Sequence, residues 1–303
     1  MNVLIPIFVS DILPIFVIAT VGFLLARYLK VSVTSVAHVS FYALSPCFVF
    51  TMLVQSTVTG SQVGRMAALA VVVMLAMGLL ARVAAIPFRL ERADLSAFML
   101  VVIFSNGGNY GLPVLLFAFG TEALSHGTVY FVASAILTYT VGVSLAAAGR
   151  RSIWKAIAGI AKVPAMYGVT AALLMLATGT AVPGTLMRPV QLLSNALIPI
   201  MVLVLGMQLE RAKAIERPAM VAAAVALSLV VAPFVALGLA WMLGISGQAR
   251  QAGVLLASMP SAVITTILAV EYDVAPSFVT NVVFLTTLLS PVTLTPLIAY
   301  LRG

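Results

Sequence analysis

Ten apolar segments follow one another along the chain, each bounded by charged residues, glycine or proline. They run over residues 4–27, 35–55, 64–88, 95–119, 124–148, 156–178, 188–209, 217–243, 249–270 and 277–300. A helix needs about 20 mainly apolar residues to cross a bilayer, so ten such helices occupy about two thirds of a chain of this length. The sequence therefore predicts an all-α integral membrane protein with ten transmembrane helices, short connections and no separate soluble domain.

The overall composition is typical of a membrane protein. Hydrophobic residues make up 63% of the 303 residues and charged residues only 8%, whereas a soluble domain carries about 25% charged residues. A net charge of +8 would suggest nucleic-acid binding in a soluble protein. Here the basic residues cluster in a few connections, so we expect no nucleic-acid partner. The single cysteine, Cys47, excludes an internal disulfide and a multi-cysteine metal site.

The distribution of lysine and arginine predicts the orientation of the helices. The first, third, fifth and seventh connections, with their flanks, hold most of the 16 basic residues. These are Arg27, Lys30, Arg82, Arg89, Arg92, Arg150, Arg151, Lys155, Lys162, Arg211, Lys213 and Arg217. Cytoplasmic loops carry an excess of basic residues. We therefore expect the odd-numbered connections in the cytoplasm and both termini on the outer face of the inner (cytoplasmic) membrane.

The two halves of the chain resemble each other. Residues 43–46 (ALSP) match residues 196–199 (ALIP), and the same shift of 153 residues places 104–107 over 257–260. Two features at one offset predict a duplication, with a first repeat over 1–150 and a second over 151–303. Five spans per repeat is an odd number, so the second repeat must be inverted. Inverted repeats are typical of transporters, whose site lies at the midplane where broken helices meet.

The most informative stretch is Ser105–Pro113, SNGGNYGLP, in the middle of the fourth segment. Three glycines and a proline so close together are expected to break a helix. Main-chain groups that are freed in hydrocarbon cost several kcal/mol each, so a break persists only where protein or a water-filled cavity surrounds it. The alternative interpretation is a glycine-rich packing face with a proline kink.

A break at this point predicts a substrate site. The N-terminus of a half-helix presents free N–H groups and a partial positive charge to an anion. The amides of Asn106 and Asn109 add hydrogen-bonding groups without a buried charge. Our candidate substrate-binding residues here are Asn106, Gly107, Gly108, Asn109 and Tyr110, and the candidate crossover hinge residues are Gly111 and Pro113.

The ninth segment carries a weaker counterpart at the equivalent position. Ser258, Met259 and Ser261 surround Pro260, so we add the first three to the substrate-binding candidates and Pro260 to the hinge. Alone, the pattern also fits a kinked span whose serines bond their own backbone. Pro46 and Pro199 predict milder kinks in the second and seventh segments.

Ionisable residues in the apolar segments are few. Asp11 is the one carboxylate clearly inside such a segment; intramembrane acids are functional candidates, but Asp11 is also near enough to the outer end to reach the headgroups. Glu271 falls at a span end, where we expect it to be solvated. No catalytic triad, phosphate-binding loop or metal-ligand spacing is present. The sequence therefore predicts no enzyme, no cofactor and no metal site.

At these residues the chain resembles the auxin efflux carrier family, which includes plant PIN proteins and bacterial carriers for malonate and related acids. The resemblance rests on Asn106 five residues before Gly111-Leu112-Pro113, on Leu205-Gly206-Met207, and on the run from Pro260 to residues 271–276 (EYDVAP). It extends over nearly the whole chain.

The resemblance implies a fold similar to the sodium/proton antiporters and bile-acid symporters. In that fold helices 1, 2, 6 and 7 form a scaffold, helices 3–5 and 8–10 form a mobile transport domain, and helices 4 and 9 cross. The substrate carboxylate would lie near Asn106, with Ser45 on the scaffold side, and an elevator-like movement would carry it across. The resemblance also implies a homodimer.

We therefore expect a secondary transporter for a small organic anion, a mono- or dicarboxylate such as a malonate-like acid, with sodium or a proton as a possible coupling ion. One alternative is a sodium- or proton-coupled ion exchanger of the same fold class, which would need carboxylates at the crossing. Another is a membrane-embedded sensor, which would need an output domain.

Overall fold

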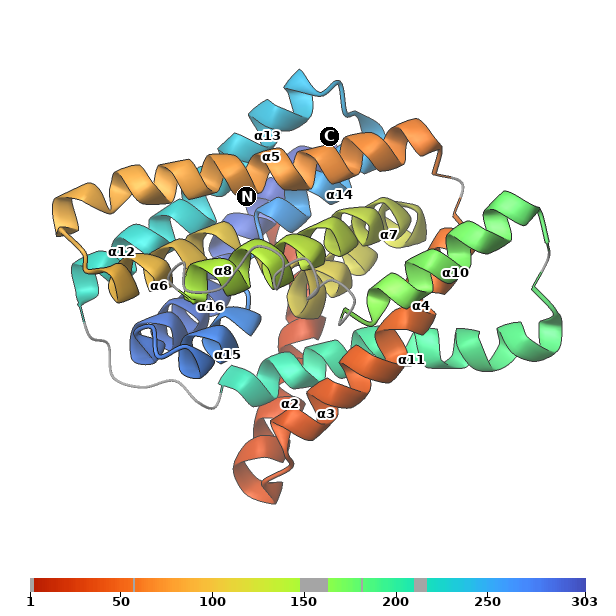
Figure 1. Ribbon diagram of the computed structural model, residues 1–303, viewed down its shortest axis with the longest axis horizontal. Helices are drawn as coiled ribbons and strands as arrows, with labels where there is room; N and C mark the ends of the chain where they lie inside the picture. The colour runs from red at the N-terminus through yellow and green to blue at the C-terminus, as the bar shows by residue number, and fades with distance from the viewer. Residues whose placement is uncertain (1–2, 57, 148–162, 181, 210–216) are drawn as a thin grey trace.

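The computed structural model describes residues 3–56, 58–147, 163–180, 182–209 and 217–303, and within these ranges it contains helices and no β-strand (Figure 1). Seven helical stretches are long and apolar enough to cross a membrane. They are Leu4–Leu29, Val33–Val54, Gly60–Phe88, Gly107–Ala146, Gly184–Leu209, Pro218–Met242 and Pro276–Arg302. The protein is therefore an integral membrane protein that crosses the bilayer several times, as the composition predicts.

The other predicted segments differ from single long helices for three reasons. The fourth and fifth share the stretch Gly107–Ala146, which leaves the helical conformation at Gly120 (φ 78°, ψ −170°). Only Ala165–Thr178 of the sixth is described. The ninth is divided into two short helices. The count of ten spans and the inverted relation of the halves remain predictions.

Several residues behind the orientation prediction lie outside the described residues. These are Arg150, Arg151, Lys155, Lys162, Arg211 and Lys213. The predicted boundary between the repeats, at residue 150, lies outside them too.

One group of helices packs around α11 (Gly184–Leu209), and we call it the α11 group. Its other members are α1 (Leu4–Ile7), η1 (Phe8–Ile12), α2 (Leu13–Leu29), α3 (Val33–Val39), η2 (Ser40–Leu44), α4 (Ser45–Val54) and α10 (Ala165–Thr178). Helix α11 packs against α2 and α4, and α10 lies along α4 (Figure 1).

Glycine brings the backbones of the α11 group close together. A Cβ atom on Gly206 of α11 would overlap the Ala19 carbonyl of α2, and one on Gly168 of α10 would overlap the Pro46 carbonyl of α4. Small residues allow such approaches between membrane helices. The proline that was expected to kink the second span is therefore also a packing point.

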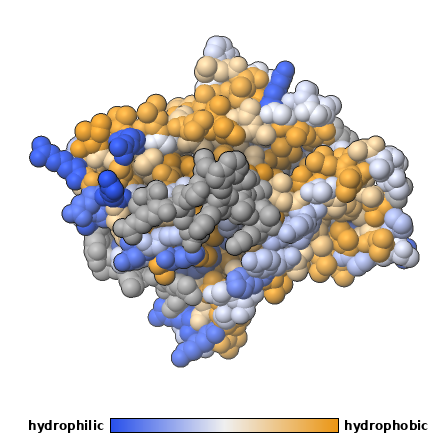
Figure 2. Space-filling model, viewed as in Figure 1, coloured by the Kyte–Doolittle hydropathy of each residue, from blue (hydrophilic) through white to orange (hydrophobic). Residues whose placement is uncertain are grey.

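The remaining helices pack around α7 (Leu112–Leu137), and we call them the α7 group. They are α5 (Gly60–Ala84), η3 (Ile86–Phe88), α6 (Arg92–Ile103), η4 (Gly107–Gly111), η5 (Thr138–Gly142), α8 (Val143–Ala146), α12 (Pro218–Ala226), η6 (Leu227–Val231), α13 (Ala232–Met242), α14 (Gly247–Ala257), α15 (Ile264–Glu271) and α16 (Pro276–Arg302). Helix α7 packs against α5 and α14, and α16 against α6, α12 and α15. Apolar residues dominate the molecular face in Figure 2, with hydrophilic residues gathered toward its edges.

Polar contacts join the helix ends in two separate sets. One set links residues beside the even-numbered connections or the chain ends: Gln55 with Gln191, Arg65 with the Gly244 carbonyl, Glu122 with Gln248, and Arg302 with Asp11 and the Ala118 carbonyl. The other set is the ion pair of Asp94 and Arg217, beside the third and seventh connections. We call these sides the even face and the odd face.

Candidate functional site: a cavity at a crossing of two interrupted helices

The fourth apolar segment is interrupted in the middle. Helix α6 ends at Ile103, Phe104 is extended (φ −99°, ψ 105°), and Asn106 is also non-helical (φ −77°, ψ 60°). The chain then rewinds at η4 as a wide π-helical turn that leads into α7. The interruption therefore lies at the start of the predicted stretch Ser105–Pro113, just before its three glycines.

The ninth segment is interrupted as well, and the two interruptions meet. Between α14 and α15, Ser261 pairs with Ser105 as an isolated antiparallel bridge. The Asn106 N–H donates to the Pro260 carbonyl (2.7 Å), and the Ala262 N–H donates to the Phe104 carbonyl (2.7 Å). Each segment thus satisfies main-chain groups that the other loses on leaving the helix, which removes the cost of exposing them in an apolar environment.

Serine hydroxyl groups strengthen the crossing. Ser105 Oγ donates to the Leu256 carbonyl at the end of α14 (2.9 Å), and Ser261 Oγ donates to the Val101 carbonyl near the end of α6 (2.7 Å). Thr286 of α16 accepts the Ser261 N–H (3.2 Å). Ser261 is buried, so these bonds fix the two interruptions against each other from within the protein.

Two glycines of η4 have different surroundings. A Cβ on Gly111 would lie 2.5 Å from Leu256 Cδ2, 3.0 Å from Met259 Cγ and 3.2 Å from the Asn106 carbonyl oxygen, whereas a Cβ on Gly107 would have no atom within 4 Å. Gly111 is therefore required for close packing of the crossing, and Gly107 lies beside open space.

That space is a cavity of about 520 Å³ between the two helix groups. The α11 group lines it with parts of α3, η2, α4, α10 and α11, and the α7 group with parts of η4, α7, η5, α8 and α15. A volume of this size fits a small organic molecule. The cavity extends to the odd face, where Val163, Gln208, Glu271 and Tyr272 line it beside the fifth, seventh and ninth connections.

The structure brings five of the nine substrate-binding candidates to this cavity. Those that line it are Ser45, Asn106, Gly107, Gly108 and Asn109. Among the other candidates, Ser258 Oγ donates to the Val254 carbonyl (2.7 Å), and the Tyr110 and Ser290 hydroxyls share a hydrogen bond of 3.0 Å. Tyr110, Ser258, Met259 and Ser261 are buried behind the cavity wall. They support the crossing.

The proposed hinge and kink residues also lie outside the cavity wall. Pro113 is at the start of α7, and Pro260 accepts the Asn106 N–H at the crossing. Pro46 is in the first turn of α4, and Pro199 is inside α11 with an exposed side chain.

Two helix N-termini converge on the cavity. Asn106 to Asn109, which begin the helical stretch through η4 and α7, line it, and so do Ala262, Val263 and Ile264 at the start of α15. Helix N-termini carry partial positive charge and free N–H groups. Among the described residues that line the cavity there is no lysine or arginine. The arrangement can therefore hold an anion with main-chain dipoles and amides.

Three side chains at the cavity wall have buried polar atoms without a hydrogen-bond partner: Asn106 Nδ2, Ser40 Oγ and Gln208 Oε1. By contrast, Ser45 Oγ donates its one proton to the Phe41 carbonyl (2.7 Å). Buried polar groups are normally satisfied, and leaving one unpaired costs about 1–3 kcal/mol. Unpaired groups beside a cavity indicate positions where a ligand supplies the missing partner.

Some polar residues that line the cavity were not among the candidates, and four of them are Ser40, Gln208, Glu271 and His38. Ser40 and Gln208 carry no motif, and only their burial without a partner distinguishes them. Glu271 is exposed at the end of α15, as its place at a span end predicts, but it also lines the cavity mouth. His38 lines the cavity as well. A helical projection of the second span, with His38, Phe41 and the candidate Ser45 on one side, is the signal that could have found His38.

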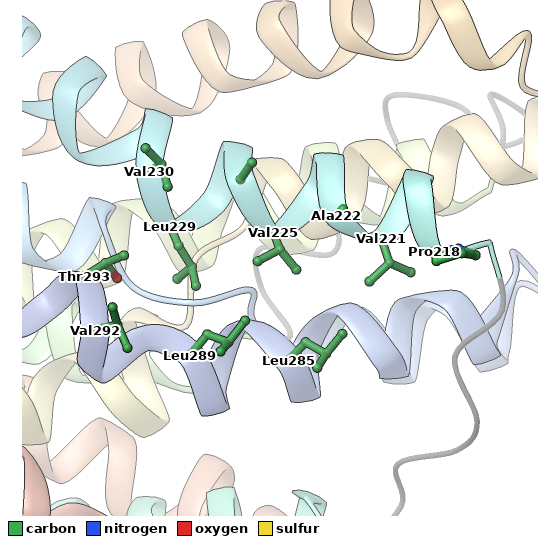
Figure 3. Close-up of a pocket in the computed structure, with 11 residues that line it drawn as sticks. Pro218, Val221, Ala222, Val225, Leu229, Val230, Leu285, Leu289, Val292 and Thr293 are labelled. Carbon is green, nitrogen blue, oxygen red and sulfur yellow. The ribbon is translucent and has the colours of Figure 1, made fainter.

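A second hollow of about 510 Å³ lies between α12–η6 and α16. Figure 3 shows Val221, Val225 and Leu229 facing Leu285 and Leu289 across it. Its polar side chain, Thr293, bonds its own helix at the Ser290 carbonyl (3.1 Å). The residues that line this groove provide no free polar group to bind a charged solute. The crossing cavity is therefore the candidate site.

Comparison with known proteins agrees with this architecture. A family model described as "Membrane transport protein" matches residues 7–159 and again residues 148–298. The chain belongs to this family, the auxin efflux carriers. The two matched ranges together cover nearly the whole of this carrier.

Two curated relatives of this auxin efflux carrier family member are archaeal. An uncharacterized transporter of Methanothermobacter thermautotrophicus is 30% identical over 193 residues, which is 62% of this chain and 62% of that protein. An uncharacterized transporter of Methanocaldococcus jannaschii is 26% identical over 213 residues, or 67% of each chain. The matched region spans less than two thirds of the first relative's length.

Proposed function

We propose that this protein is a secondary transporter that moves a small organic anion, a mono- or dicarboxylate, through the cavity at the crossing. The observation that carries the proposal is the convergence of two helix N-termini and the unpaired, buried Asn106 amide on one cavity. An anion bound there accepts a hydrogen bond from the Asn106 side-chain amide and interacts favourably with the positive ends of the two helix dipoles. Membership of a transport family supports the same conclusion.

The two helix groups supply the parts of an elevator-like mechanism. In our proposal the α11 group, which contains spans 1, 2, 6 and 7, is the scaffold, and the α7 group, which contains spans 3–5 and 8–10, is the transport domain. The cavity lies between them, so a movement of one group against the other changes the side from which the substrate is reached. The two inverted repeats over 1–150 and 151–303 belong to this proposal.

The orientation in the membrane follows from the basic residues. With the odd face in the cytoplasm, the cavity mouth beside Glu271 opens inward. We propose a location in the inner membrane with both termini outside, and a homodimer formed through the scaffold.

An ion exchanger of the same fold class is the second candidate function, and Glu271 is the observation that favours it. This carboxylate lines the cavity and is able to take up and release a cation. Glu271 lies at the mouth of the cavity, away from the helix ends at the crossing. This position suits the binding of a coupling ion better than the binding of the only transported ion. We therefore rank coupled anion transport first.

Uptake by proteoliposomes separates these functions. Purified protein is reconstituted, and the uptake of labelled mono- and dicarboxylates is measured with and without sodium and pH gradients. Saturable uptake of at least one carboxylate supports the proposal, and its dependence on a gradient identifies the coupling ion. Proton or sodium flux without carboxylate uptake would favour the exchanger. Ligand binding without any flux would favour a sensor.

A further inference from the structure

An ion pair between a buried carboxylate and a partly exposed guanidinium joins the two helix groups on the even face. Asp11 Oδ2 lies 2.6 Å from Arg302 Nη2, and the Asp11 side chain is 4% exposed. Asp11 belongs to η1 in the α11 group, and Arg302 ends α16 in the α7 group. The sequence left open whether Asp11 reaches the headgroups. It instead points into the protein.

Both side chains of this pair make further contacts. Ser10 Oγ donates to Asp11 Oδ1 (2.9 Å), and Arg302 Nη2 also donates to the Ala118 carbonyl at the end of the fourth span (2.8 Å). The Arg302 guanidinium lies over the Phe119 ring, 5.9 Å from its centroid. Arg302 therefore binds an acid of the α11 group and a carbonyl of the α7 group at the same time.

Three other charged groups on the even face have partners of their own. Glu122 accepts from Gln248 (2.9 Å), Arg250 donates to the Tyr300 hydroxyl (3.0 Å), and Arg65 donates to the Gly244 carbonyl (3.1 Å). All of these contacts lie within the α7 group. Among the described residues, the ion pair that crosses between the two groups is Asp11–Arg302.

The pair lies on the face opposite the cavity mouth. The cavity extends to the odd face, beside Gln208 and Glu271, while Asp11, Ala118 and Arg302 meet at the even face. The cavity thus separates the two helix groups at the odd face, and the ion pair joins them at the even face. Separating the pair is costly because it leaves the buried Asp11 carboxylate uncompensated.

We propose that Asp11 and Arg302 form a gate that keeps the even face closed while the cavity is open to the odd face, and that this pair must separate before the cavity opens to the even side. The inference rests on the alternating access of the proposed function. It assigns to Asp11 a role in conformation and none in contacting substrate.

The test measures access to the cavity and needs no substrate. In a Cys47→Ser background, Ala135→Cys places a thiol on the cavity wall, and a membrane-impermeant thiol reagent is applied to each side of oriented vesicles. The parent should label mainly from the odd face. Asp11→Asn or Arg302→Gln should raise labelling from the even face several-fold and lower it from the odd face. The exchange Asp11→Arg with Arg302→Asp should restore the parent pattern.

Asp94→Asn is the matched control, because Asp94 and Arg217 form an ion pair within the α7 group. It should leave both labelling rates unchanged. Unchanged rates in folded Asp11→Asn and Arg302→Gln variants would overturn the gate and leave the pair a structural contact. If those two variants fail to fold, Arg302→Lys and the charge exchange, which both keep opposite charges at the two positions, decide. The labelling pattern of the parent in these variants supports the gate, and a shifted labelling pattern overturns it. Altered labelling in a protein that moves no anion would retain the gate and refute the proposed substrate.

Discussion

Ser105 and Ser261 form an antiparallel bridge between two helical segments that are each interrupted at that point. The bridge joins the fourth and ninth spans through main-chain hydrogen bonds of 2.7 Å on either side. Neither interruption has enough internal partners to exist alone in an apolar environment. Their mutual pairing explains how unwound chain persists in the interior of the protein, and it orients the two helix N-termini toward the cavity.

Gly111 should be more sensitive to substitution than Gly107. Gly111→Ala places a methyl group 2.5 Å from Leu256 Cδ2, and overpacking of this kind costs about 1–3 kcal/mol. We expect a clearly lower Tm for Gly111→Ala in a detergent thermal-shift assay. Gly107→Ala, whose methyl group meets nothing within 4 Å, is the control and should keep the parent Tm. Equal Tm values would contradict the packing of the crossing.

Ser40 should contribute more to substrate affinity than Ser45. Ser45 already donates to the Phe41 carbonyl (2.7 Å), whereas Ser40 Oγ has no partner and gains one when an anion binds. A hydrogen bond contributes about 1 kcal/mol net, so Ser40→Ala should raise KM about fivefold. Ser45→Ala should change KM little. Uptake kinetics of the two variants, measured side by side, provide the comparison, and a larger effect of Ser45→Ala would contradict it.

Two hollows of similar volume allow a test of which one the substrate uses. Met201→Trp fills part of the crossing cavity, and Leu289→Trp fills part of the groove in Figure 3. We expect Met201→Trp to abolish most uptake because it occupies the space beside Gly108. Leu289→Trp should retain uptake. Equal loss in both variants would mean that the groove also takes part in transport.

The sequence predicts the interruption near Asn106 because glycine and proline act locally on helix geometry. It does not predict that the interruption begins one residue earlier, at Phe104, because the hydrogen bond of the Phe104 carbonyl with the Ala262 N–H is a tertiary contact. Ser40 and Gln208 could not be predicted as site residues for a similar reason. The sequence around a serine or glutamine in a span does not reveal whether its side chain lacks a hydrogen-bond partner. The contact of Asp11 with Arg302 depends on two ends of the chain meeting, which periodicity does not encode.

The relation between the two halves of the chain is also only partly predictable from the sequence. The two short motifs that recur after a shift of 153 residues predict a duplication, which remains a prediction. The counterpart motif at Ser258 predicts the second interruption. Its serines turn toward carbonyl groups of the protein and not toward the cavity, which depends on how the spans cross.

Asn106 is the residue on which the account depends most directly, because its buried amide nitrogen has no partner and it begins the helix at the crossing. The decisive measurement is equilibrium binding of a transported carboxylate to the purified parent protein and to Asn106→Ala, with Asn195→Ala, an exposed asparagine outside the cavity, as the control. A hydrogen bond to a charged group contributes about 1.5–3 kcal/mol. The account therefore predicts that Kd rises about ten- to a hundredfold in Asn106→Ala and stays unchanged in Asn195→Ala. An unchanged Kd in a correctly folded Asn106→Ala protein would contradict it.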